Sequence, residues 1–163
     1  MNERKLNPEH ISALIEMLNN GSYYQLLGMK IIRLESGYAE VTMNAERKHW
    51  NPFGCVHGGA YASLIDTAVY WAAYCDQEED AGFTSLDLSV TNLAMSTTGK
   101  LIAKGHAIKE GRSTCLCEAM IFDETGKKLA HGTSKLLMLH QKQTVSDAMR
   151  EMGYSALPDK FIR

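Results

Sequence analysis

Asp66 is the residue whose surroundings most plainly call for a chemical explanation. It is the only charged side chain in the otherwise apolar stretch 60–75. Burial raises the pKa of a carboxyl group and costs free energy unless the charge is paired. Two interpretations stay open. One is a structural aspartate held by backbone or hydroxyl groups, and the other is a catalytic carboxylate, because carboxyl groups with shifted pKa values gather at functional sites.

His57, Gly58 and Gly59 directly precede this apolar stretch and suit the start of a helix. Glycine lets the backbone come close to a ligand, and the first N–H groups of a helix have no intrahelical partners. Such N–H groups bind negative charge, including the oxyanion that forms when a carbonyl is attacked. The Gly-Gly pair alone is a weak indication, since it is also typical of tight packing against a strand.

A geometric limit separates Gly58 from Asp66. Eight positions on one helix span about 12 Å along its axis. A base and an oxyanion donor must both lie about 3 Å from the same reacting centre. Two antiparallel helices from two subunits would bring Gly58 of one to Asp66 of the other. If the two groups form one site, the sequence therefore predicts a twofold homodimer or a dimer of dimers.

The elements that would position these residues follow from hydrophobic patterns. A first helix is expected at about 8–19, capped by Asn7 and ended by Gly21. The stretch 60–75 is apolar on nearly every side, which is typical of a helix enclosed by protein. Strands are expected at 30–35, 38–44, 86–91, 101–108, 113–122 and 129–139, and a short helix at 145–152. These elements predict an α+β fold, with a five- to six-stranded antiparallel sheet wrapped around the central helix.

Length and composition bound the class of protein. The 163 residues suit one domain over 1–163, with its core at about 23–140 and a C-terminal tail over 141–163. The net charge of -2 and the pI near 6.3 argue against a nucleic-acid-binding surface. No apolar run reaches the roughly 20 residues that span a bilayer, and the polar start lacks the apolar core of a signal peptide. We expect a cytoplasmic protein with no membrane or nucleic-acid partner.

The four cysteines raise the question of a metal site. Cys55-x-His57 together with Cys115-x-Cys117 suggests zinc, because two cysteines two positions apart share one face of a strand. Neither pair has the spacing usual in structural zinc sites, and free cysteines commonly act as small buried apolar residues. We therefore expect no metal and reduced thiols, as is usual in the cytoplasm.

The segment NPFGCVHGG, from Asn51 to Gly59, followed by Asp66 seven residues later, resembles the acyl-CoA thioesterases of the hotdog superfamily. It is most similar to the PaaI-like and THEM-type branch of the 4-hydroxybenzoyl-CoA thioesterase superfamily. The run TSLDL at 84–88 and the Gly111-Arg112 turn are similar as well, so that the resemblance covers roughly 23–139. It implies a hotdog fold and hydrolysis of an acyl-CoA thioester to a free acid and CoA.

The resemblance also implies catalytic roles for the matching residues. The Gly58 amide would polarise the thioester carbonyl, with Gly59 as its structural neighbour. Asp66 of the partner subunit would act as general base on water or as nucleophile. Asn51 would orient the water or the thioester. His57 would brace Asn51 and its loop. Two other roles stay open for it: a cap of the loop before the helix, and a direct acid–base role, which Asp66 already fills.

Further residues are predicted to contact water or substrate. Ser85 matches a hydroxyl that helps to hold the attacking water, but a shift of one residue would put Thr84 in its place. Tyr70 and Tyr74 either pack in the core or dimer interface or line an acyl pocket. Arg112, with a neighbouring lysine, would meet the phosphates of CoA. Coenzyme A is part of the substrate, so no cofactor is expected.

Two other functions stay open. A non-catalytic hotdog protein that binds acyl-CoA as a sensor has no need of a charged group at the helix centre, and no DNA-binding segment is evident. A hotdog dehydratase would pair a histidine with a helix carboxylate in a different motif. Asp66 therefore favours the hydrolase. Its acyl group stays open among aromatic, medium-chain and long-chain thioesters.

Overall fold

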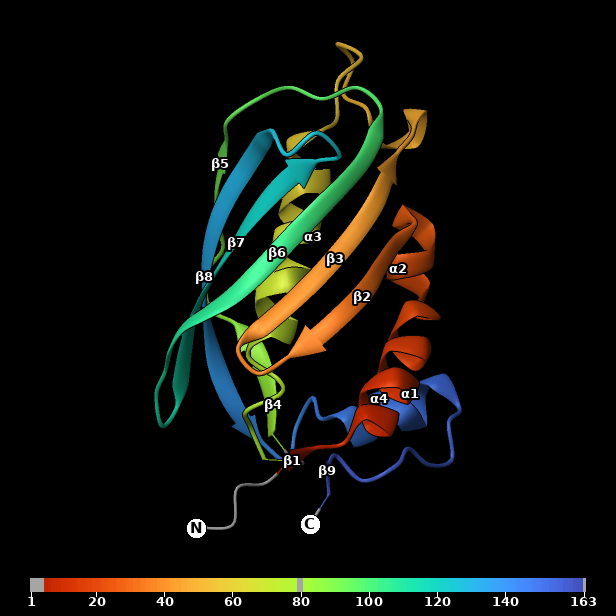
Figure 1. Ribbon diagram of the computed structural model, residues 1–163, viewed down its shortest axis with the longest axis vertical. Coiled ribbons are helices and arrows are strands. Elements are labelled where there is room, and N and C mark those ends of the chain that lie inside the picture. Colours follow the sequence, from red (N-terminus) through yellow and green to blue (C-terminus); the bar gives the residue numbers. More distant parts are fainter. Residues whose placement is uncertain (1–4, 79–80, 163) are drawn as a thin grey trace.

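The computed structural model describes residues 5–78 and 81–162, so the outermost ends of the predicted domain lie outside the described residues. Within the described ranges, a seven-stranded antiparallel sheet curls around one central helix (Figure 1). The strand order is β2-β3-β6-β7-β8-β4, and β5 also pairs with β8. The predicted α+β hotdog fold is confirmed.

The strands follow the alternating patterns of the sequence. Five of the six predicted segments are confirmed, with ends that differ by at most two residues. The main sheet consists of β2 (Met29–Glu35), β3 (Tyr38–Ala45), β4 (Ala81–Ser85), β5 (Ser89–Asn92), β6 (Gly99–Glu110), β7 (Thr114–Asp123) and β8 (Lys128–His140). The long strands β6, β7 and β8 follow one another as a meander, which forms the wall that faces the helix (Figure 1).

The edge strand is broken into β4 and β5. From Ser85 to Ser89 the chain takes four steps, whereas the facing part of β8, from Leu136 to Thr133, takes three. One extra residue therefore forms a bulge. The predicted continuous strand at 86–91 is wrong in its first half. The described sheet has seven strands rather than five or six because this edge is in two pieces.

Asp87 holds the bulge in place. Its Oδ1 accepts a hydrogen bond from the Lys135 N–H at 3.0 Å, and its carbonyl oxygen accepts one from Ser134 Oγ at 2.7 Å. Lys135 Nζ also donates to Asp87 Oδ2 at 2.7 Å. These contacts interrupt the regular pairing, and the side chains of Leu86 and Leu88 are exposed.

Helix α3, Gly58–Ala72, is the predicted central helix. It begins two residues before the expected 60–75 because His57 caps it, and it ends earlier because the chain turns after Ala73. It packs on β3, β6, β7 and β8. Gly105 of β6 permits the close approach, since a Cβ there would lie 2.3 Å from the carbonyl oxygen of Ala68. No described helix, α3 included, is both long and apolar enough to cross a membrane.

Two helices precede the sheet. Helix α1, Pro8–Asn19, has the predicted bounds, and Asn7 Oδ1 accepts a hydrogen bond from the Glu9 N–H at 3.1 Å. Gly21 was predicted to end this helix, but Asn20 occupies the C-cap. Gly21 instead precedes α2, Ser22–Leu27, a short helix that the sequence analysis did not predict.

The two terminal segments meet at one end of the sheet (Figure 1). Strand β1 (Lys5–Leu6) pairs with β9 (Phe161–Ile162), and the Asn7 N–H donates to the Lys160 carbonyl oxygen at 2.8 Å. Helix α4, Val145–Met152, has the predicted bounds and begins with a capping box formed by Thr144 and Asp147. A short 3₁₀ helix, Arg47–His49, leads from β3 into the loop before α3.

Candidate active site

Asp66 lies in the middle of α3, where its carboxylate meets the end of β4. Ser85 Oγ donates a hydrogen bond to Asp66 Oδ1 at 3.0 Å. The side chain of Asp66 is partly buried. The hydroxyl that contacts Asp66 is that of Ser85 and not that of its neighbour Thr84. The bulge after Ser85 lies directly beside this contact.

The start of α3 is organised by the His57 side chain. Its Nδ1 accepts a hydrogen bond from the Gly59 N–H at 2.8 Å, so that His57 is the N-cap of the helix. Since Nδ1 accepts, the neutral ring carries its proton on Nε2. A Cβ on Gly58 would lie 3.0 Å from Asn92 Nδ2, so the backbone approaches β5 closely here. As the first helical residue, Gly58 has an N–H without an intrahelical acceptor.

Asn51 shapes the loop that leads to this helix start. Its Oδ1 accepts hydrogen bonds from the N–H groups of Phe53 at 2.9 Å and Cys55 at 3.2 Å. Its Nδ2 group has no recorded partner among residues 5–78 and 81–162 and can donate to a ligand. His57 bonds to Gly59 and, through its N–H, to the His49 carbonyl oxygen at 2.8 Å.

The predicted catalytic residues thus fall into two groups on one chain. The first group is at the helix start and consists of Asn51, His57, Gly58 and Gly59. The second consists of Asp66, two turns further along the helix, and Ser85 at the end of β4. Because the separation is about 12 Å along the helix axis, one chain does not bring both groups to a single reacting atom.

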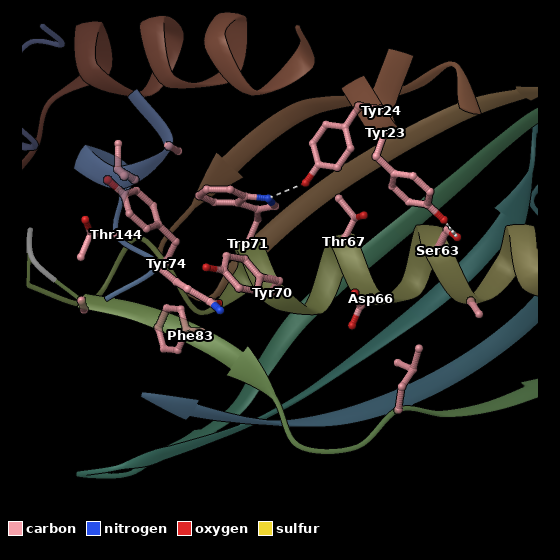
Figure 2. A pocket seen from close by; sticks show the side chains of 16 residues that line it. Tyr23, Tyr24, Ser63, Asp66, Thr67, Tyr70, Trp71, Tyr74, Phe83 and Thr144 are labelled. Atoms are coloured by element: carbon pink, nitrogen blue, oxygen red, sulfur yellow. Dashed lines mark hydrogen bonds between the residues drawn. The ribbon is translucent and has the colours of Figure 1, made fainter. Parts of the chain in front are cut away.

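A cavity of about 520 Å³ opens beside Asp66. Six aromatic residues line it, among them Tyr70 and Tyr74, two of the predicted substrate contacts. Figure 2 shows Asp66 near the middle of the row of lining side chains, with Tyr23 and Ser63 toward one end and Tyr74 and Thr144 toward the other. The remaining aromatic lining comes from Tyr24, Trp71 and Phe83. Such a cavity suits an apolar acyl group whose reacting end meets the carboxylate.

Two phenols of this cavity, those of Tyr24 and Tyr70, are kept neutral. Burial raises the pKa of Tyr24 and of Tyr70 above the ordinary tyrosine value. Tyr24 Oη accepts a hydrogen bond from Trp71 Nε1 at 2.9 Å, which joins α2 to α3 (Figure 2). These groups therefore serve as shape and as neutral hydrogen-bonding groups rather than as bases at neutral pH.

Several lining residues were missed in the sequence. Tyr23 and Tyr24 come from the unpredicted helix α2, and Thr144 and Val145 come from the start of α4. The adjacent tyrosines and the apolar first residue of α4 were the available signals. Neither of these sequence signals shows that α2 or α4 packs near α3, because each of these contacts joins segments far apart in the chain.

Arg112 lies in the turn between β6 and β7, where its side chain is exposed. It lines neither the cavity beside Asp66 nor the surface pocket beside Asn51. Among the described residues, no three histidine, cysteine or acidic side chains gather in a way that could hold a metal ion. Cys115 and Cys117 are buried in β7, and burial raises the pKa of the Cys117 thiol to about 12.

Comparison with known proteins identifies consistent relatives. A family model described as "Thioesterase superfamily" matches residues 53–130. The 1,4-dihydroxy-2-naphthoyl-CoA hydrolase of Listeria monocytogenes is 33% identical over 105 residues, which cover 64% of this chain and 85% of that protein.

Solved structures agree with this result. A thioesterase from Haemophilus influenzae superposes with a TM-score of 0.76 at 25% identity, covering 87% of this chain and 97% of the other. The E. coli PaaI protein from the phenylacetic acid degradation operon has the same fold, with a TM-score of 0.73, 24% identity, and coverage of 83% and 96%. In both superpositions nearly the whole of the other chain is matched, but a smaller share of this chain is. Some residues of this chain therefore have no counterpart in those structures.

Proposed function

Because this chain belongs to the thioesterase superfamily and is a thioester hydrolase, we propose that its substrate is an acyl-CoA, which it cleaves to a free acid and CoA. The Listeria relative is named for hydrolysis of a CoA thioester, which supports this substrate class. The observation that carries the proposal is the Asp66–Ser85 pair beside an aromatic cavity. A carboxylate at that position can act on the carbonyl end of an acyl group held in the cavity.

The chemical step uses Asp66 and one water molecule. Ser85 donates to Oδ1, which leaves Oδ2 free to take a proton from water. The water oxygen then attacks the thioester carbonyl carbon, and the carbonyl electron pair moves to oxygen. Collapse of this intermediate breaks the C–S bond, and the CoA thiolate leaves and takes up a proton. Attack by Asp66 itself, through an anhydride that water cleaves, gives the same products.

The oxyanion of this step needs a donor that the same chain cannot supply. We assign the role to the amide of Gly58 of the partner subunit, placed opposite Asp66 by antiparallel packing of two copies of α3. Asn51 beside it would orient the thioester through its Nδ2 group. His57 would hold the helix start in place by its bond to Gly59. Removal of one oxyanion donor typically costs about 10²–10³ in kcat.

The surface supports a homodimer at this edge. Exposed apolar side chains flank both groups of site residues: Phe53 is 90% exposed, Met95 77% and Leu86 55%. Exposed apolar side chains beside a functional site are typical of an interaction surface. The broken edge formed by β4 and β5 adjoins it. We propose that two copies join here, and that a dimer of dimers is the larger assembly.

The remaining assignments follow from the substrate. Activation of water by a carboxylate requires no cofactor, and CoA arrives with the acyl group. Arg112 would contact CoA phosphates only if oligomerisation places the β6–β7 turn beside the active site of another subunit. The reaction fits an enzyme of the cytoplasm, the compartment in which acyl-CoA thioesters and reduced cysteines are expected.

The test is release of free thiol from a panel of aromatic, medium-chain and long-chain acyl-CoAs. We expect turnover by the wild type, and a loss in kcat of about 10³-fold or more for Asp66→Asn, because a general base typically supplies 10²–10⁴-fold. Asp123→Asn, at the end of β7, is the matched control and should keep full activity. Circular dichroism should show the same fold for all three proteins.

Two outcomes would contradict the proposal. Near-normal turnover by Asp66→Asn would remove the carboxylate from the mechanism. Saturable acyl-CoA binding by the wild type without thiol release would instead favour the non-catalytic sensor.

A further inference from the structure

A second cavity of about 200 Å³ lies behind the first, at the C-terminal end of α3. Residues of α1, of α4 and of the segment that leads to β9 line it. Tyr74 and Val145 line both cavities. These two side chains therefore form a wall that separates the acyl cavity from the second cavity. We call them the partition.

The Tyr74 half of the partition is held rigidly. Its hydroxyl lies 2.8 Å from His10 Nε2, and His10 Nδ1 lies 2.7 Å from the carbonyl oxygen of Pro158. Because a carbonyl can only accept, Nδ1 donates and Nε2 accepts from the tyrosine. Lys160 Nζ lies 3.8 Å from the Tyr74 ring centroid and donates to the Tyr74 carbonyl oxygen at 2.7 Å. Both terminal segments thus fix this ring.

The Val145 half is small by comparison. Val145 is the first residue of α4 and is 8% exposed. The capping box between Thr144 and Asp147 fixes the start of this helix, with Asp147 Oδ2 accepting from the Thr144 N–H at 2.9 Å. The contribution of Val145 to the partition is therefore an isopropyl group on a fixed backbone. Truncating it would open a passage without moving Tyr74.

We propose that Tyr74 and Val145 set the length limit of the acyl group. The substrates are then acyl-CoAs whose acyl group ends at the partition, within the first cavity. This deepens the proposed function and rests on it. The Val145 half and the supports of Tyr74 lie outside residues 53–130, the part that the family model matches. The terminal segments thereby determine specificity, although they hold none of the proposed catalytic groups.

The test compares kcat/KM over straight-chain acyl-CoAs from butyryl to palmitoyl. Val145→Ala should join the cavities and raise kcat/KM about tenfold for chains just beyond the wild-type limit, since one methylene in an apolar pocket is worth 10-fold or more. Val145→Met should move the limit toward shorter chains. The control is Val41→Ala in β3, which removes the same atoms from a fully buried position that lines neither cavity. Its length profile should match that of the wild type.

A second readout does not depend on turnover. Affinities of the same acyl-CoAs, measured by calorimetry in an Asp66→Asn background with and without Val145→Ala, should show the same shift in length. If both Val145 variants turn over or bind acyl-CoAs with the same dependence on chain length as the wild type, the partition does not set the length limit. The proposed hydrolase function would still stand. Absence of both turnover and binding in the wild type for every acyl-CoA, the aromatic ones of the first panel included, would overturn the proposed function, and the partition with it.

Discussion

The two ends of α3 differ in almost every physical respect. Its start is rich in glycine and exposed, and its capping side chain, His57, is polar. Its other end carries the buried rings of Trp71 and Tyr74, and the terminal segments cover it. The helix dipole adds a difference in sign, since the start favours negative charge and the end favours positive charge. The Lys160 ammonium indeed lies on the carbonyl groups that follow the helix.

This contrast separates chemistry from recognition within one helix. The start suits an oxyanion, which needs free N–H donors and little else. The end suits an apolar acyl chain, which needs an apolar cavity of matching shape from which water is excluded. Asp66 stands between them, where the acyl carbonyl must lie if the chain points toward the partition.

After the loss expected for Asp66→Asn, the next largest effect is expected from removing the amide hydrogen at the helix start. Gly58→Pro deletes the N–H, and proline is well tolerated at the first position of a helix. The preceding residue, His57, already has the extended φ of -67° and ψ of 140° that proline requires. We expect kcat to fall about 10²–10³-fold. Steady-state thiol release with a preferred acyl-CoA measures this.

Gly58→Ala is the matched control for that substitution. It adds a Cβ at the same place, 3.0 Å from Asn92 Nδ2, but keeps the amide hydrogen. Because the Asn92 side chain is exposed and flexible, it can move aside for either variant. Equal kcat values for the proline and alanine variants would show that the Gly58 amide plays no part in the reaction.

Mixed dimers test whether the two groups belong to different chains. Asp66→Asn and Gly58→Pro are each expected to be nearly inactive alone. In a mixed dimer one site carries both defects and the other carries neither. Random exchange of subunits should restore about a quarter of wild-type activity, as twofold symmetry requires. Activity that stays at the level of the parents after confirmed exchange would place the whole site within one chain.

At the covered end, the effect should appear in stability. Tyr74→Phe leaves the buried Nε2 of His10 without its donor, and an unsatisfied buried group costs about 1–3 kcal/mol. Chemical denaturation should show this loss in the free energy of unfolding. Tyr23→Phe removes the hydroxyl of an exposed ring, which bonds to the half-buried Ser63, and should change stability little. Equal losses in the two variants would contradict a specific role for the His10 contact.

The smallest effect concerns Glu110, near the covered end, which accepts a hydrogen bond from Gln77 Nε2 at 2.8 Å. Burial, followed by the nearby Asp76 charge, raises the pKa of this carboxyl. The folded state therefore binds its proton more tightly than the unfolded state. The stability that this proton contributes is present at low pH and is lost as the pH rises through the raised pKa.

Glu110→Gln should accordingly raise the melting temperature slightly at pH 7. The gain in the free energy of unfolding should be less than about 0.5 kcal/mol, because solvent screens this largely exposed carboxyl group. The gain should vanish below about pH 4, under the ordinary pKa of a glutamate. Thermal melts across this range measure it. A gain that is independent of pH would point to a cause other than this carboxyl.

Most of the fold was predictable because its patterns are long. The strands β6, β7 and β8 alternate over ten or more residues each, and α1 and α4 have capping residues at their predicted starts. Helix α2 was not predicted because it is six residues long and lacks a side-chain cap. The break at 86–88 was missed because Leu86 and Leu88 alternate as in a strand, whereas Asp87 makes tertiary contacts that no local pattern shows.

The candidate site could be proposed from the sequence where one residue contrasts with its neighbours. A charge in an apolar run marked Asp66, and paired glycines marked the helix start. The choice between Thr84 and Ser85 needed the structure, because the register of β4 on β8 decides which side chain faces α3. The pocket residues of α2 and α4 could not be predicted, since they meet α3 only through the tertiary fold. The contact of Arg112 with CoA stays a prediction.

The one-residue bulge in the edge strand also bears on how this protein avoids unwanted association. A long, flat and unpaired strand is a template on which any extended chain can add, and that is a route to aggregation. Here the edge bends between Ser85 and Ser89, and the salt bridge between Asp87 and Lys135 occupies the bend. Only a surface that matches this kink can pair along its whole length. The same extra residue that lies beside the Ser85–Asp66 contact thus also limits the partners that this edge accepts.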